Sequence, residues 1–210
     1  QLGATSFAPT WVGWRRAQLL LRREGCRRAR LQSRRNCVSH VGRSWLARGL
    51  LPLRDMAARP LRLKGFDYRG CHRYFLTFCT ADRHRAFRSA EVVDRAVCEI
   101  RRACCDANFA LLAYCLMPDH AHLLVEGKSE QANLKQFAKL VRQRTAIAYT
   151  QMSGQRLWQS GFYERVLRDE EATPDIVRYI VGNPVRAGLT GSVADYPFSG
   201  SDACDIRVIL

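Results

Sequence analysis

The chain has 210 residues, with 34 Lys plus Arg, 19 Asp plus Glu and a formal net charge of +15. This length favours one domain with a core of ordinary size, and an apolar fraction of 47% excludes a wholly disordered protein. No uncharged stretch approaches the roughly 20 apolar residues that cross a bilayer, which excludes an integral membrane protein. A sequence pI near 10 favours a polyanionic partner such as nucleic acid.

The positive charge is concentrated in the first quarter of the chain. Residues 1–55 contain twelve Arg, no Lys and two acidic residues, which accounts for +10 of the total. We therefore expect residues 1–65 to be an Arg-rich tail and linker. This segment is interpreted either as a disordered basic arm or as translated upstream sequence before a true start at Met56. Residues 66–205 are predicted to form the folded domain.

The nine cysteines contain no C-x-x-C pair, which argues against a structural zinc site. Cys79, Cys98, Cys104 and Cys115 lie in segments of apolar periodicity, where a thiol behaves as a small hydrophobe. This usage favours reduced cysteines in the core of a cytoplasmic protein.

From Cys71 onward the apolar pattern predicts alternating strands and helices. Residues 72–80 alternate as a strand, and Ser89 is placed to cap a helix that runs to about residue 106. Residues 109–116 form a short apolar run that ends in a tight turn at 117–119. Residues 120–126 return as the hairpin partner of that run.

The second half of the pattern adds two helices and a strand. A helix is predicted over about 131–152 and ends at Gly154, 162–168 suit a short strand, and 173–182 suit a third helix capped by Thr173. The order β-α-β-β-α-β-α predicts an α+β protein of the split βαβ kind, an antiparallel sheet with helices on one face.

His120 and His122 are the first candidates for chemistry. Side chains two apart on a strand point the same way, so both imidazoles of this pair can reach one divalent metal ion. An H-x-H pair alone is a weak signal, and two strand histidines without a ligand remain the alternative.

Tyr179 and Asn183 are four residues apart in the last predicted helix and therefore share a face. A phenol that attacks phosphorus must lose its proton, and since its ordinary pKa is about 10 it needs a nearby cation or base. A metal at the two histidines can supply that, with the Asn183 amide oxygen as a third ligand. The alternatives are a packing tyrosine and a helix stop before Pro184.

Three segments, YCLMPDHAHLLVE (114–126), LWQSGFYERVLRDEE (157–171) and YIVGNPVRAGL (179–189), occur in an order and spacing that resembles the IS200-like tyrosine transposases. The nearest branch is the REP-associated tyrosine transposases of bacteria. The resemblance covers about residues 66–202 and omits the tail. It implies a ferredoxin-like βαββαβ fold followed by a C-terminal helix that carries the tyrosine.

The resemblance also implies a reaction and its residues. In that family an HUH motif binds a divalent metal, Mg²⁺ or Mn²⁺, and one tyrosine attacks single-stranded DNA, leaving a 5′-phosphotyrosine and a free 3′-OH. His120 and His122 match the HUH histidines, Tyr179 matches the nucleophile, and Asn183 falls where the helix supplies a third polar ligand. Tyr163 is the rival nucleophile but lies outside the tyrosine motif.

DNA contacts are expected from basic and aromatic side chains of the domain. Lys135, Lys139 and Arg142 form one stripe of the second helix and are predicted to neutralise phosphates, with a solvated helix face as the alternative. Trp158 and Tyr163 are predicted to stack on bases, or else to pack in the core.

The leading hypothesis is a cytoplasmic, metal-dependent nuclease and strand transferase for single-stranded DNA hairpins or repeats, monomeric or homodimeric. The alternatives are a DNA-binding protein that keeps the fold without turnover, such as a domesticated repressor, and an RNA-binding module of the same topology.

Overall fold

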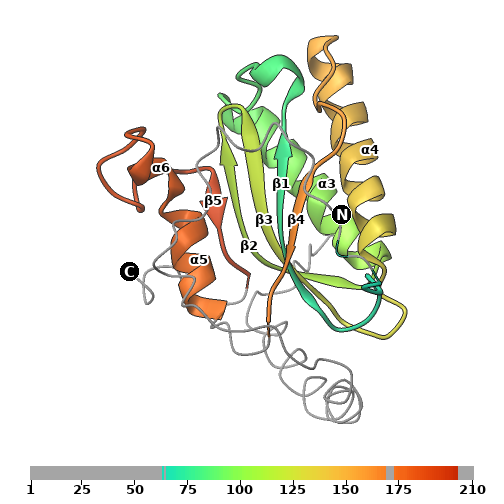
Figure 1. Cartoon of the computed structure of the whole chain (residues 1–210). Helices are drawn as coiled ribbons and strands as arrows, with labels where there is room; N and C mark the ends of the chain where they lie inside the picture. Colours follow the sequence, from blue (N-terminus) through green and yellow to red (C-terminus); the bar gives the residue numbers. More distant parts are fainter. Residues whose placement is uncertain (1–62, 64, 169–172, 203–210) are drawn as a thin grey trace, which may run out of the picture. The chain divides into compact units, whose positions relative to one another are not determined.

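The computed structural model describes residue 63, residues 65–168 and residues 173–202, so the predicted tail lies almost entirely outside the described residues. Within these residues five antiparallel strands form one sheet in the order β4-β1-β3-β2-β5 (Figure 1). The strands are β1 (Arg73–Cys79), β2 (Phe109–Met117), β3 (His120–Gly127), β4 (Tyr163–Val166) and β5 (Ser199–Gly200). The helices are α3 (Ala90–Asp106), α4 (Leu134–Ser153), α5 (Thr173–Val181) and α6 (Asn183–Arg186), with a short 3₁₀ turn, η3 (Ala81–Arg83).

Local signals at the helix ends explain why most predicted boundaries are close. The Ser89 side chain accepts a hydrogen bond from the Val92 backbone N–H, as expected for the cap of α3. Gly154 ends α4 in the left-handed conformation, with φ of 70°. Asn133 caps the start of α4, because its side chain accepts from two backbone N–H groups of the first turn, so this helix begins slightly later than predicted.

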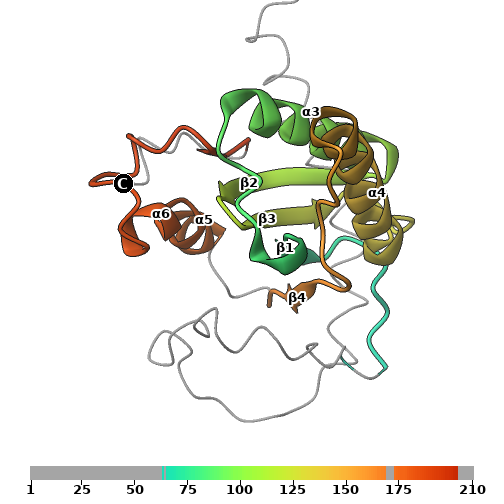
Figure 2. The same ribbon diagram turned by 90° about the horizontal axis from the view of Figure 1, so that it is seen from above.

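The helices cover both faces of the sheet (Figure 2). Helices α3 and α4 pack together over one face, against Tyr74, Leu76 and Phe78 of β1. Helix α5 packs on β2 and β3 on the opposite face, where Phe75 and Leu124 belong to a second, smaller apolar cluster. These are called the α3–α4 face and the α5 face below.

The α+β fold with an antiparallel sheet is confirmed, but the placing of all helices on one face is wrong for α5. The physical reason is that α5 has apolar residues of its own to bury, Val177, Ile180 and Val181. The α3–α4 face is already occupied, and Ala113 and Cys115 of β2 offer an apolar surface on the other side.

Most of the predicted core cysteines are buried. Cys79, Cys104 and Cys115 are buried, and burial raises the pKa of the Cys104 and Cys115 thiols to about 12. Cys98 is exposed, contrary to the prediction, because it lies on the outer side of α3. No helix in the described part of the chain is long and apolar enough to span a membrane.

Candidate active site

The central strand β3 carries both predicted metal-binding histidines on the α5 face. In the sheet register, His122 lies between Thr77 on β1 and Cys115 on β2. His120 and His122 are 2% and 6% exposed, and their ring centroids are 4.7 Å apart at an interplanar angle of 80°. The prediction that both imidazoles point the same way is confirmed.

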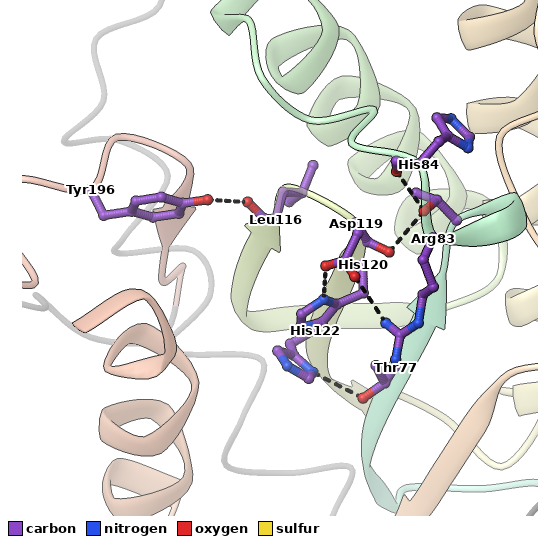
Figure 3. Close-up of polar contacts among 9 residues, drawn as sticks. Thr77, Arg83, His84, Leu116, Asp119, His120, His122 and Tyr196 are labelled. Carbon is purple, nitrogen blue, oxygen red and sulfur yellow. Dashed lines mark hydrogen bonds and ion pairs between the residues drawn. The ribbon is translucent and has the colours of Figure 1, made fainter. Parts of the chain in front are cut away.

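Asp119 determines which nitrogen of His120 remains available (Figure 3). His120 Nδ1 lies 2.6 Å from Asp119 Oδ1, and because a carboxylate can only accept, Nδ1 carries the proton. The hydrogen bond from His120 holds the pKa of the Asp119 carboxyl below its usual range. Nε2 is then the ring nitrogen that stays available, and it is buried without a hydrogen-bond partner among the described residues. A buried polar atom of this kind is rare in a core and is what a metal ligand requires.

His122 is held by Thr77 on the neighbouring strand. Its Nδ1 and Thr77 Oγ1 form a hydrogen bond of 2.9 Å, which orients the ring (Figure 3). Burial lowers the pKa of the His122 imidazole well below its usual range, and the positive charge of Arg186 is among the smaller effects that lower it further. The ring is therefore neutral at pH 7, the form that binds a metal ion.

The two imidazoles fit a divalent metal as partial ligands. Within the described residues, His, Cys, Asp and Glu form no group of three that could hold a metal ion. His120 and His122 would therefore supply two nitrogen ligands, and the remaining positions would fall to an amide, water or a DNA phosphate. Two imidazoles suit Mn²⁺ better than Mg²⁺, which prefers oxygen ligands throughout.

Helix α5 brings Tyr179 to the same face of the sheet. Its ring stands edge-on to Phe75, with centroids 6.3 Å apart, and Phe75 in turn stacks on His122 at 5.3 Å. Tyr179 is half-buried. The structure thus joins the predicted nucleophile to the histidine pair through one aromatic side chain.

Asn183 lies beyond the end of α5, as the first residue of α6. Its Nδ2 donates to the Ile180 carbonyl at 3.1 Å, and its Oδ1 accepts from Arg186 Nη2 at 2.8 Å. Pro184 follows and has no N–H for the Ile180 carbonyl, so the side chain takes the place of that donor. These contacts support the helix-stop alternative, and a role of Asn183 as metal ligand stays a prediction.

The predicted basic stripe lies on α4, across the sheet from the histidines. Lys135 and Lys139 are exposed there. Arg142 is half-buried and its Nη2 donates to the Gln159 carbonyl, while burial and then the nearby Arg156 lower its pKa. One donor of Arg142 is thus bound to the protein's own backbone, and its role in neutralising phosphate stays a prediction.

The two aromatic candidates for DNA contact differ in burial. Trp158 is 5% exposed, packs on Phe78 and Phe87, and donates from Nε1 to Thr145 Oγ1 at 2.8 Å. The expectation that Trp158 stacks on bases is therefore wrong, and its alternative as core holds. Tyr163 is half-buried on the edge strand β4, opposite Thr77, so it lies on the α5 face.

Sequence reasoning missed three residues of this site: Asp119, Thr77 and Arg186. The acidic residue directly before the first histidine was a usable signal, since metal-binding histidines commonly donate their other N–H to a carboxylate. Thr77 reaches His122 only through strand pairing. Arg186 is within the third quoted segment, but nothing in the residue pattern placed its guanidinium beside Tyr179.

Comparisons with known proteins agree with this fold. Residues 70–183 match the family described as transposase IS200-like. A Haemophilus influenzae protein provisionally named a REP-associated tyrosine transposase is 28% identical over 140 residues, 60% of this chain and 77% of the relative. The REP-associated tyrosine transposase of Escherichia coli is 27% identical over 113 residues, 52% of this chain and 62% of the relative.

A solved structure is similar in fold. The structure of a REP-associated tyrosine transposase bound to a REP hairpin superposes with a TM-score of 0.55 at 19% identity, covering 70% of this chain and 94% of that one. At this identity the likeness bears on the fold alone. The family match, by contrast, spans more than half of the sequence and includes both histidines and the tyrosine. The chain belongs to the IS200-like transposase family.

Proposed function

We propose that this protein cleaves and rejoins single-stranded DNA at hairpin or repeat sequences, with Tyr179 as the nucleophile. The observation that carries the proposal is the shared face: two buried imidazoles and the tyrosine helix meet on the α5 face, linked through Phe75. The similar solved transposase is bound to a REP hairpin, and both curated relatives are named for REP sequences, which supports hairpin DNA as the substrate class. The reaction would take place in the bacterial cytoplasm, where such DNA lies.

The proposed step is an in-line displacement at a phosphodiester. The Tyr179 oxygen forms a bond to phosphorus, the bond from phosphorus to the 3′ oxygen breaks, and the phenol proton is lost while the leaving oxygen gains one. The products are a 5′-phosphotyrosine and a 3′-OH, and the reverse attack by a 3′-OH rejoins DNA without a nucleotide cofactor.

Each residue of the site has a defined part in this step. His120 and His122 hold a divalent metal, which when bound neutralises charge at the phosphate. Asp119 keeps the proton on His120 Nδ1 and so leaves Nε2 free to ligate. Phe75 and the apolar side of α5 limit the positions that the Tyr179 ring can take, which lowers the entropic part of the barrier.

A hairpin oligonucleotide labelled at its 3′ end, on the fragment that stays bonded to the tyrosine, tests the proposal directly. With Mn²⁺ or Mg²⁺ present we expect a covalent protein–DNA adduct that survives denaturing electrophoresis. The adduct should be lost in Tyr179→Phe, in His120→Ala and after chelation of the metal. An adduct that survives Tyr179→Phe and vanishes in Tyr163→Phe would assign the nucleophile to β4.

Binding without an adduct under any metal would contradict cleavage and favour a DNA-binding protein that has lost turnover. Binding measurements on the same hairpin distinguish this result from a failure to recognise the chosen sequence. Three unrelated hairpins and a single-stranded control of equal length separate recognition of the hairpin from charge-driven binding.

A further inference from the structure

Arg186, the last residue of α6, turns its guanidinium back toward Tyr179. Its Cζ lies over the tyrosine ring, 4.1 Å from the ring centroid, a cation–π distance. Its Nη2 donates to the Tyr179 backbone carbonyl and to Asn183 Oδ1. One side chain therefore contacts both the backbone and the ring of the proposed nucleophile.

The break between α5 and α6 explains how Arg186 reaches a residue seven positions earlier. Pro184 supplies no N–H to the end of α5, which leaves carbonyl groups there for side chains to satisfy. Gly182 leaves room for the returning side chain, since a Cβ at this position would lie 2.8 Å from Arg186 Nη1. The sequence G-N-P-V-R is thus suited to fold an arginine over the preceding helical turn.

The charge of Arg186 also reaches the histidine site. Burial has the larger effect on the pKa of the Cys115 thiol and raises it, but the charge of Arg186 lowers it, and Cys115 lies beside His122 in the sheet register. Among the described residues Nε and Nη1 of Arg186 make no hydrogen bond, so a guanidinium with five N–H donors keeps some of them for another group.

We propose that Arg186 is the positioning residue for the nucleophile of this transposase, an inference that rests on the proposed cleavage by Tyr179. Arg186 fixes the orientation of the Tyr179 ring and keeps a positive charge over the face of that ring as the phenol oxygen bonds to phosphorus and the 3′ oxygen leaves. Negative charge gathers at the phosphorus centre in that transition state, and a fixed cation nearby stabilises it without reorganisation.

Single-turnover rates of adduct formation, at saturating hairpin and Mn²⁺, test the proposal. We expect Arg186→Ala to lower the maximal rate constant roughly 10- to 100-fold, the size of effect that a misplaced reacting group produces. Hairpin affinity should change by less than about threefold. Arg186→Lys should fall in between, because it keeps the charge and loses the planar fork.

Added guanidinium ion, at concentrations that leave the melting temperature unchanged, should restore part of the rate of Arg186→Ala. A purely structural cap would show no such rescue. Arg178→Ala is the matched control, because it removes the same charge from an exposed position of α5. Arg178 is ion-paired with Asp175 at 2.7 Å, and this variant should react like the wild type.

The outcomes separate this role from the cleavage function. If the wild type forms the adduct and Arg186→Ala reacts as fast as Arg178→Ala, the positioning role is overturned and cleavage stands. The same holds if the loss lies only in hairpin affinity or in stability, without rescue by guanidinium. If Arg186→Ala fails to fold, Arg186→Lys decides the question. A wild-type rate in Arg186→Lys overturns the positioning role, and a reduced rate in folded Arg186→Lys supports it. Absence of the adduct in the wild type removes both proposals together.

Discussion

The two faces of the sheet differ in the side chains that they bury. On the α3–α4 face, large apolar side chains such as Phe137 and Phe109 stack closely, with ring centroids 4.6 Å apart, and the indole N–H of Trp158 has its partner in Thr145. On the α5 face the cluster is smaller, and His120 keeps a buried Nε2 without a partner among the described residues.

This difference divides stability from chemistry across one layer of strands. Residues that alternate along β3 belong to opposite faces: Ala121 and Leu123 pack toward α3 and α4, whereas His120 and His122 face α5. A change on the α3–α4 face should therefore act mainly on the free energy of unfolding. A change on the α5 face should act mainly on metal binding and on the reaction.

The largest effect is expected on the α5 face, from the variant Tyr179→Phe. This variant removes one hydroxyl from a half-buried ring, so adduct formation should fall below detection while the melting temperature stays within a few degrees. Denaturing electrophoresis and thermal melts measure the two quantities. Tyr163→Phe is the matched control and should still form the adduct. A large loss of stability in Tyr179→Phe would contradict the expectation that changes on the α5 face act mainly on the reaction.

On the α3–α4 face, Trp158→Ala should lower the free energy of unfolding by about 3–5 kcal/mol, because it deletes a buried aromatic ring and its hydrogen bond to Thr145. Denaturant titration measures this loss. Trp158→Phe keeps most of the ring and should cost less. Reduced hairpin affinity at unchanged stability would instead return Trp158 to the DNA-binding surface.

Asp119→Asn tests the support of the histidine pair. The change removes the carboxylate that holds the proton on His120 Nδ1, so metal affinity should fall about 10- to 100-fold, as is common for partners behind a metal ligand. Calorimetric titration with Mn²⁺ measures this affinity. Asp106→Asn, which breaks an ion pair with Arg144 at 2.6 Å, is the control and should leave metal affinity unaltered.

The smallest effect is expected from the exposed lysines of α4. If Lys135 and Lys139 each neutralise a phosphate, replacing either with Ala should lower the slope of log affinity against log salt concentration by about 0.7 to 0.9. Hairpin binding at several salt concentrations measures the slope. An unchanged slope in both variants would confine the DNA to the α5 side of the sheet.

Much of the fold and part of the site follow from local patterns. The alternation of side chains along a strand is enough to place His120 and His122 together, because the period of two does not depend on the rest of the fold. Ser89 and Gly154 end their helices through contacts within one turn of the chain, so their positions are readable from the sequence. The order of strands and helices, read from the apolar pattern of each segment, was enough to predict the antiparallel sheet.

Other features required the packed structure. The pattern of α5 shows that it has an apolar side, and only the occupied α3–α4 face decides that this side covers the histidine face of the sheet. The charge of Arg142 and the aromatic ring of Trp158 suggested DNA contact, but burial turned both toward the protein's own polar groups. Arg186 meets Tyr179 only because Pro184 and Gly182 allow its return. Composition and periodicity describe what a segment can bury or bind, whereas tertiary packing decides which partner it meets.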